Sequence, residues 1–158
     1  MRLIAIAGLL ALAAPLSAHD KGVATAQPGA LPASLRGAAA TVDSFHAALH
    51  RGDTRAAAAL LADDALIFES GGVERTKAEY SAHHLPADAE FSRLVSSVVT
   101  RRTGNSAGNL AWIASEGRTT GTYDGKALDL TTTETMLLRR TNSGWRIVHI
   151  HWSSAKRG

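Results

Sequence analysis

The residues with the clearest capacity for chemistry lie near the C-terminus, where two histidines alternate with apolar residues. The stretch Gly144–Ser154 reads Gly-Trp-Arg-Ile-Val-His-Ile-His-Trp-Ser-Ser, an apolar and β-branched pattern typical of a strand. Because successive residues of a strand point to opposite faces, His149 and His151 share one face, with Cα atoms roughly 6–7 Å apart. Two imidazoles placed in this way can form a pocket wall, half of a metal site, or a satisfied polar pair in the core.

The two faces of this strand differ in polarity. Val148, Ile150 and Trp152 alternate with the histidines and make the more apolar face. An apolar sheet face needs cover, and burying an unpaired imidazole costs roughly 1–3 kcal/mol. We therefore predict that His149 and His151 face an interior pocket and that the apolar face packs against a second subunit.

Further polar and aromatic residues are predicted to line the same pocket. Thr76 and Glu79 form a capping box that starts a short helix, which carries Tyr80, His83 and His84. The adjacent histidines are about 100° apart on a helix, so one of them can face inward. Two predicted strands add Trp112 and Glu116 on one shared face, and Glu134 on another. The predicted pocket residues are His149, His151, Tyr80, His83, His84 and Trp112.

Three kinds of chemistry suit these candidates. A pocket alone binds a small organic molecule, as a binding or accessory protein does. An imidazole beside a carboxylate can transfer protons, which makes His149, His151, Glu116 and Glu134 the catalytic candidates. A cluster of imidazoles suits copper or zinc, with His83, His84, His149 and His151 as ligands. The chain has no cysteine, which excludes thiolate catalysis and disulfide bonds.

The first 33 residues differ in character from the rest. Met1-Arg2 precedes the apolar run Leu3–Ala14, and Ala18 supplies the small residue needed just before a cleavage point, the pattern of a secretory signal peptide at residues 1–18. Residues 19–33 contain proline, glycine and alanine without periodicity and are interpreted as a flexible leader. The expected location is therefore periplasmic or secreted, without membrane attachment after cleavage.

The domain at residues 34–155 begins with helices and ends with strands. Val42, Phe45 and Leu49 predict a first helix, followed by a turn at Arg51-Gly52-Asp53. The remaining elements are predicted as a helix at Arg55–Leu61, a strand at Ala65–Glu69, a helix from Thr76 to about His84 that ends before Pro86, and strands at Glu90–Arg102, Asn109–Thr120, Lys126–Arg140 and Trp145–Ser154. Long strands joined by hairpins after three helices indicate an α+β fold with an antiparallel sheet.

The charge distribution argues against a nucleic-acid partner. The formal net charge is +3, and the basic residues are dispersed in short pairs such as Arg101-Arg102. A nucleic-acid-binding protein usually concentrates its basic residues in a patch or stripe. The small excess of basic residues is therefore not interpreted as a binding surface.

Two segments resemble a known superfamily. The stretch Val42–Asp53 is similar to the first helix and turn of the nuclear transport factor 2-like superfamily. The stretch Gly144–Ser153 resembles its last strand in the SnoaL-like and ketosteroid-isomerase-like, DUF4440-type branch. The association domain of calcium/calmodulin-dependent kinases has a similar His-x-His-x-Ser ending. The resemblance extends over roughly Ser34–Ser154.

This resemblance implies a cone: a curved antiparallel sheet wrapped around three N-terminal helices, with an internal pocket. It also implies a homodimer and a small-molecule ligand. The superfamily contains enzymes and pure binding proteins, so the resemblance leaves the reaction open. The residues do not match a steroid isomerase, which needs a tyrosine and a protonated acid around the substrate oxygen. No cofactor is firmly implied.

Overall fold

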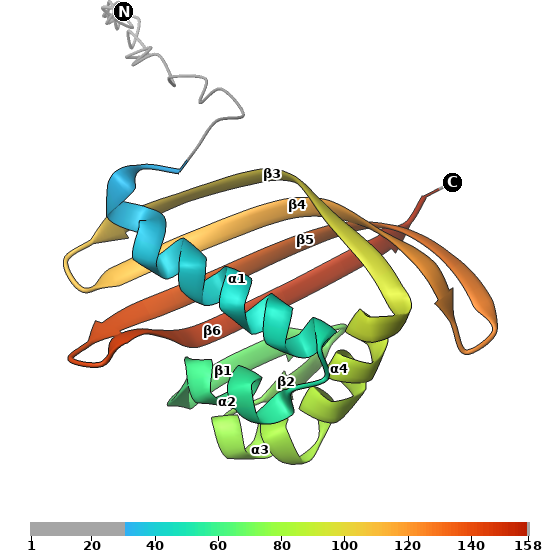
Figure 1. The fold of residues 1–158 in the computed structure, drawn as a ribbon, viewed down its shortest axis with the longest axis horizontal. Helices are drawn as coiled ribbons and strands as arrows, with labels where there is room; N and C mark the ends of the chain where they lie inside the picture. Colours follow the sequence, from blue (N-terminus) through green and yellow to red (C-terminus); the bar gives the residue numbers. More distant parts are fainter. Residues whose placement is uncertain (1–30, 158) are drawn as a thin grey trace, which may run out of the picture.

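A curved six-stranded sheet with a long helix across one face forms the framework of the protein (Figure 1). This computed structural model describes residues 31–157. The predicted signal peptide at residues 1–18, and the part of the leader at residues 19–30, lie outside the described residues. The strands are β1 (Leu61–Glu69), β2 (Gly72–Glu74), β3 (Val95–Ala107), β4 (Leu110–Tyr123), β5 (Lys126–Thr141) and β6 (Gly144–Lys156).

The strand order is β2-β1-β6-β5-β4-β3, so β6 lies inside the sheet. Neighbouring strands are antiparallel except β1 and β6, which are parallel. The predicted α+β class is confirmed, and the parallel pair is the one departure from an antiparallel sheet. It arises because β6 pairs with both β5 and β1. β6 is antiparallel to β5 but runs in the same direction as β1.

The helices are η1 (Ala33–Leu35), α1 (Arg36–His50), α2 (Thr54–Leu60), α3 (Lys77–Ala82) and α4 (His84–Leu94). None of the described helices is long and apolar enough to cross a bilayer. Asp53 caps α2 by accepting a hydrogen bond from the Ala56 amide at 2.9 Å. Thr76 caps α3 in the same way through the Glu79 amide, as the capping box predicts.

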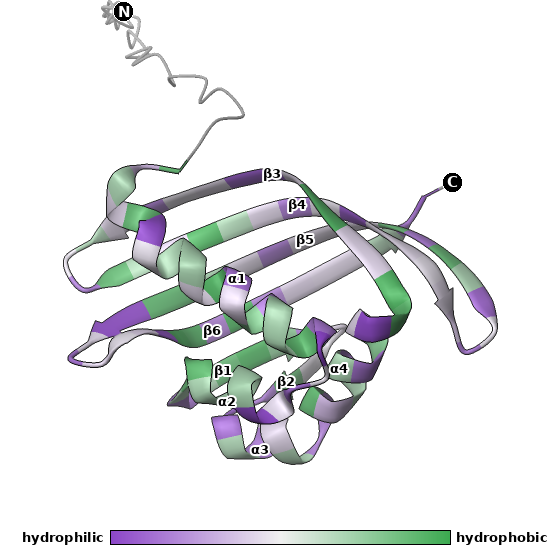
Figure 2. Cartoon of the chain, viewed as in Figure 1, coloured by the Kyte–Doolittle hydropathy of each residue, from purple (hydrophilic) through white to green (hydrophobic). Residues whose placement is uncertain are grey.

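The core lies between α1 and the sheet. Val42, Phe45 and Leu49 are fully or almost fully buried, which confirms the apolar stripe of the first helix. Hydrophobic residues, green in Figure 2, follow the turns of α1 and most of β1. The sheet contributes buried side chains from four strands: Ile67, Ala111, Ile113, Met136, Leu138, Ile147 and Ile150.

The segment after α3 is helical where the sequence predicts a strand. The predicted helix does end before Pro86, because α3 stops at Ala82, but a further helix, α4, then runs from His84 to Leu94. The strand predicted at Glu90–Arg102 therefore begins only at Val95, as β3. Pro86 lies in the first turn of α4, where its missing N–H leaves no intrahelical hydrogen bond unmade. The proline therefore belongs to the start of this helix.

Two short turns fix the register of the sheet. Ser70 and Gly71 both have positive φ between β1 and β2, and Asp124 and Gly125 do so between β4 and β5. Two-residue turns of this kind match the twist of a hairpin, which confirms the hairpin predicted at Asp124-Gly125. The first turn places Glu69 opposite Gly72 at the end of β1.

A bulge in β6 reverses the predicted faces of this strand. Leu138 pairs with Ile147 and Leu137 pairs with His149, so Val148 is an extra residue. Beyond the bulge the alternation shifts by one, and Ile150 and Trp152 point toward the helices, where Ile150 is fully buried.

His149 and His151 consequently lie on the outer face. The prediction that they face the interior is corrected, because a strict period of two does not hold across a bulge.

The bulge predicts how two substitutions in β6 change the free energy of unfolding. Replacing Ile150 with Ala should lower the free energy of unfolding by about 2–5 kcal/mol, because it removes a fully buried side chain. Replacing exposed His151 with Ala should change it by no more than about 0.5 kcal/mol. Urea denaturation of both variants measures the difference. A larger loss for His151→Ala than for Ile150→Ala would show that the strand has no bulge at Val148.

Candidate functional site

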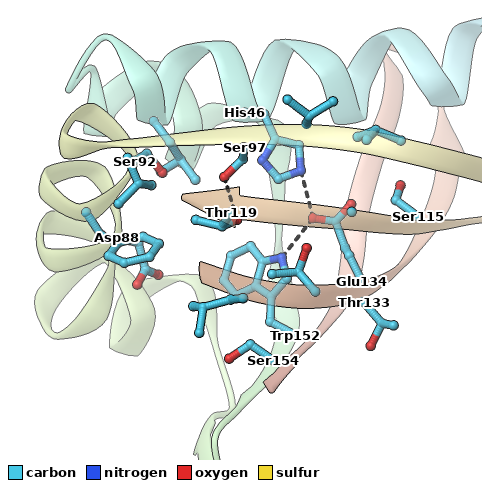
Figure 3. Close-up of a pocket in the computed structure, with 18 of the residues that line it drawn as sticks. His46, Asp88, Ser92, Ser97, Ser115, Thr119, Thr133, Glu134, Trp152 and Ser154 are labelled. Atoms are coloured by element: carbon cyan, nitrogen blue, oxygen red, sulfur yellow. Dashed lines mark hydrogen bonds and ion pairs between the residues drawn. The ribbon is translucent and has the colours of Figure 1, made fainter. Parts of the chain in front are cut away.

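A cavity of about 610 Å³ lies between α1, α4 and the concave side of the sheet (Figure 3). Its volume falls in the range usual for small-molecule sites. The long strands β3–β6 supply its floor, and α1 and α4 supply two of its walls. The side chains that carry its polar chemistry come from α1, β1, α4, β3, β5 and β6: His46, Glu69, Asp88, Arg102, Glu134 and Trp152.

A histidine and a carboxylate meet at one end of this cavity. His46, on α1, lies with Nε2 2.7 Å from Oε2 of Glu134, on β5. The indole Nε1–H of Trp152 donates to the same oxygen at 2.8 Å. Figure 3 shows the three side chains converging at the carboxylate, with the His46 ring and the Trp152 indole on either side of it. The described residues offer no hydrogen-bond partner for His46 Nδ1.

Glu134 is ionised although it is buried. Only 9% of the residue is exposed. Burial alone would raise the pKa of Glu134, but the hydrogen bonds from His46 and Trp152 and the charge of Arg102 together hold it below its usual range. The carboxylate is therefore available as a fixed negative charge beside the imidazole.

The packing of Phe45 and Trp152 explains why these groups meet. Phe45 is buried under α1, and its ring stacks on Trp152 at a centroid distance of 6.3 Å. His46 follows Phe45 in the helix, about 100° further round, so it points to the edge of the apolar stripe. That edge faces Glu134.

Arg102 occupies the same end but is engaged by other groups. Its Nη1 donates to Asp43 Oδ1 at 2.6 Å, and its Nε donates to Ser115 Oγ at 3.2 Å. This pair ties α1 to β3 and β4 at the cavity wall. The guanidinium therefore supports the wall and contributes its charge to Glu134 from a distance.

Acidic groups gather at the other end of the cavity. Glu69 ends β1 opposite Trp152, and Asp88 lies on α4. The hydroxyl of buried Tyr80 donates to Asp88 Oδ2 at 2.6 Å. Burial raises the pKa of Glu69 to about 7, with a further contribution from Asp88. Burial also raises the pKa of Asp88, against the opposing effects of Tyr80 and His84.

The structure separates the residues that the sequence predicts for this site. Glu134 and Glu116 line the cavity. Glu116 is exposed, and its Oε1 lies 3.9 Å from Nη1 of Arg101. Tyr80 lies in the core and reaches the cavity only through Asp88. The other predicted residues are not in the cavity lining: His83, His84, Trp112, His149 and His151.

His83 and His84 are exposed at the junction of α3 and α4. His84 Nδ1 forms an ion pair with the buried carboxylate of Glu74 on β2. Glu74 pairs with buried Ile67, so this ion pair lies on the face of the sheet opposite to His149 and His151. Within residues 31–157, no three His, Cys, Asp or Glu side chains are arranged to hold a metal ion.

Trp112, His149 and His151 lie on the outer face of the sheet. Trp112 pairs with Leu137, and Leu137 pairs with His149. The ring of Phe68, on β1, packs edge-on against His149 at 5.2 Å and against His151 at 6.3 Å. His149 Nδ1 also contacts the Leu66 carbonyl at 2.8 Å. These residues form one continuous row across four strands.

Sequence reasoning missed His46, Glu69 and Asp88. His46 borders the stripe of Val42, Phe45 and Leu49, and position at such an edge is compatible with solvent exposure or with a cavity. Glu69 immediately precedes a turn, where polar residues are common. A polar residue at the edge of a strongly apolar helix is the one signal that would have selected His46.

Comparisons with known proteins give a consistent family. The chain matches the SnoaL-like domain over residues 38–156. No curated protein matches it. A candidate ketosteroid isomerase from Shewanella frigidimarina is 34% identical, with a TM-score of 0.73, and the match covers 78% of this chain and 100% of that one.

Other solved structures share the fold. A candidate calcium/calmodulin-dependent protein kinase II association domain from Xanthomonas campestris is 25% identical, with a TM-score of 0.65, over 80% of this chain and 93% of that one. A nuclear transport factor 2-like protein with a cystatin-like fold from Novosphingobium aromaticivorans is 16% identical, with a TM-score of 0.62, over 73% and 78% of the two chains. The last of these proteins is named as nuclear transport factor 2-like, after the superfamily that the sequence resembles.

The raised pKa of Glu69 predicts a pH-dependent effect on stability. A carboxyl whose pKa is higher in the folded than in the unfolded protein destabilises the fold as pH rises from about 4.5 to about 7. Glu69→Gln should therefore raise the free energy of unfolding at pH 8 by about 1 kcal/mol, after allowance for solvent screening of this half-buried group. At pH 4 the variant and the parent should be equally stable.

Thermal unfolding at the two pH values measures this difference, expected as about 3–5 °C at pH 8. Glu90→Gln, which alters an exposed carboxylate of α4, serves as the control and should show no such change. Destabilisation of Glu69→Gln at pH 8 would contradict the prediction.

Proposed function

We propose that this chain, which belongs to the SnoaL-like domain family, is a small-molecule pocket protein whose His46–Glu134 pair transfers protons on the bound ligand. The reaction type is that of an isomerase or a dehydratase. The observation that carries this proposal is the contact between His46 Nε2 and the ionised, buried carboxylate of Glu134 at the end of the cavity.

The geometry supports a general base. A carboxylate that accepts a hydrogen bond from Nε2–H keeps the proton of a neutral imidazole on that nitrogen, so Nδ1 carries the lone pair. Figure 3 shows the His46 ring at the cavity, with its second nitrogen turned away from Glu134. His46 Nδ1 is thus the group positioned to accept a proton from a ligand.

Each partner of His46 has a definable effect. When Nδ1 takes a proton, the imidazolium is stabilised by the adjacent Glu134 carboxylate. Trp152 holds that carboxylate in place through its indole N–H, so both residues position and stabilise His46. Return of the proton to a different carbon completes an isomerisation. Return of the proton to a departing hydroxyl completes a dehydration.

The comparison with the Shewanella frigidimarina protein is in agreement with this reaction type. That protein is named as a candidate ketosteroid isomerase, and an isomerase of this kind moves a proton between carbon atoms. The present chain brings a histidine and a glutamate to its cavity for this step. We extend the proposal to an exported protein, on the basis of the signal-peptide pattern at residues 1–18.

Hydrogen–deuterium exchange tests the proton transfer directly. A panel of small ketones incubated with the protein in D2O should show enzyme-dependent exchange of protons next to the carbonyl, followed by proton NMR. His46→Ala should slow this exchange by about 10²–10⁴-fold, the usual contribution of a general base. Glu134→Gln should also slow it, because the imidazole loses its ionic partner.

His83→Ala is the matched control, since it removes an exposed histidine outside the cavity and should leave the exchange rate unchanged. Equal exchange by His46→Ala and the parent would refute the dyad. Ketone binding without exchange in the parent protein would assign a binding or accessory role in place of catalysis.

We also propose that two copies of the chain pair through the outer face of the sheet. The row formed by Phe68, Trp112, Leu137 and His149 presents large apolar side chains that are each more than a third exposed, apart from the half-buried His149. Continuous apolar surface of this kind marks interaction sites. The expected interface is therefore the face opposite to the one that the unbulged strand predicts.

Replacing Leu137 with Glu should weaken this homodimer by about 100-fold, because a charge in the centre of an apolar interface is left without a partner. Sedimentation velocity at a series of concentrations measures the change. Leu94→Glu, on α4 and away from this row, is the control and should leave the dimer intact. A parent protein that stays monomeric at about 100 μM would refute the interface, since typical stable pairs associate well below this concentration.

A further inference from the structure

The charges that line the cavity are strongly unbalanced. Four acidic side chains face a single arginine among the described lining residues: Asp43, Glu69, Asp88 and Glu134 against Arg102. Glu116 also borders the cavity, but it shares the strand face of Trp112 and lies beside Arg101. Arg102 already donates to Asp43 and Ser115. The cavity therefore has no free guanidinium or ammonium group with which to bind a carboxylate or a phosphate.

The imbalance is greatest at the end formed by Glu69 and Asp88. Neither carboxylate forms an ion pair with a described lysine or arginine, and the side chain of Glu69 receives no hydrogen bond from a described residue. Tyr80 gives Asp88 one neutral hydrogen bond. His84, one turn earlier on α4, is paired with Glu74. A positive charge in the cavity would meet two uncompensated carboxyl groups here.

The opposite end of the cavity adds another negative charge, that of Glu134. Glu134 is nine-tenths buried, and its Oε1 has no hydrogen-bond partner, while Oε2 accepts from both His46 and Trp152. Burying an unsatisfied acceptor is unfavourable by roughly 1–3 kcal/mol. Because Oε1 is itself shielded from the cavity, Glu134 acts on a ligand through its negative charge.

The remaining lining is suited to the body of an organic cation. The rings of Phe91 and Trp152 line the cavity, together with Leu49, Val95 and Leu130. Aromatic faces attract ammonium groups, and aliphatic side chains accommodate an apolar body. Charge and aromatic surface thus select the same class of molecule.

We propose that the natural ligand is a small organic amine, bound with its ammonium group at Glu69 and Asp88 and its apolar body toward His46 and Trp152. This inference rests on the small-molecule pocket of the proposed function and specifies the ligand class that the pocket takes. It places the reacting carbon of the ligand at His46, at the end of the molecule remote from the amine.

Three probes of matched size test the inference: 2-phenylethylamine, 2-phenylethanol and phenylacetate. Binding to the parent protein at pH 8 is followed by two-dimensional NMR, with the Trp152 indole N–H as reporter of the cavity. The amine should bind about tenfold more tightly than the alcohol, the effect of roughly 1.4 kcal/mol. Phenylacetate should bind more weakly than the alcohol.

Glu69→Gln should reduce the affinity for the amine to about that for the alcohol and leave the affinity for the alcohol unchanged. Glu90→Gln carries the same change in net charge outside the cavity and should preserve the preference for the amine. Lowering the pH of the parent from 8 to 5.5 should also reduce the preference, because the Glu69 carboxyl, with its pKa raised to about 7, becomes protonated while the amine stays charged.

The outcomes separate this inference from the proposal on which it rests. Equal affinity for amine and alcohol, or tightest binding of phenylacetate, overturns the amine class and leaves the pocket standing. Retention of the preference in Glu69→Gln overturns the assigned position of the ammonium group. Failure of all three probes to shift the Trp152 reporter overturns the inference, while ketone exchange by His46 still tests the proposed reaction independently.

Discussion

The packing of α1 on the concave side of the sheet is the constraint on which the rest of the structure depends. Phe45 and Val42 are buried in the same core cluster as Met136 and Ile150, and burial of this stripe fixes the rotation of the helix. Once the apolar stripe is buried, the direction in which the side chains at its edge leave the helix is fixed. His46 is at that edge, so the same packing that stabilises the fold brings an imidazole to Glu134.

Burial of Glu134 then becomes tolerable only because the surrounding groups arrive with it. A carboxylate removed from water needs hydrogen bonds and opposite charge. Trp152 supplies an N–H, and it can do so only because the bulge at Val148 turns it inward. The hydrophobic core and the polar end of the cavity therefore depend on the same features. The bulge turns side chains of β6 into both, and loss of the contact between α1 and the sheet would expose both.

Local signals in the sequence predict most of the framework. The cap at Asp53, the capping box at Thr76 and the turn at Asp124-Gly125 act through residues a few positions apart, and each forms as expected. The bulge at Val148 depends on how β5 and β1 pair with β6, so no local pattern reveals it. The prediction of an interior His149 and His151 fails for this reason, and Pro86 misleads because its effect depends on its position within the helix.

The site itself is partly predictable. Glu134 is identified from its strand, because it shares one face with Thr132 and Met136, and an acidic residue beside an apolar one is unusual on a face that points inward. Its partner comes from a helix 88 positions earlier, and only the tertiary packing joins them. Glu69 and Asp88 likewise come from different elements, and burial, which sequence does not display, gives them their altered acidity.

The position of β6 has a consequence for how the chain folds. This strand is the most C-terminal one, yet it lies inside the sheet and joins β1 to β5. Without residues 144–156, β1 has only β2 as a partner strand, and the long-range pairs that join it to the long strands cannot form. Closing of the sheet therefore brings together residues as far apart as Leu66 and His149, 83 positions along the chain, and contacts of such long sequence separation slow the formation of a fold.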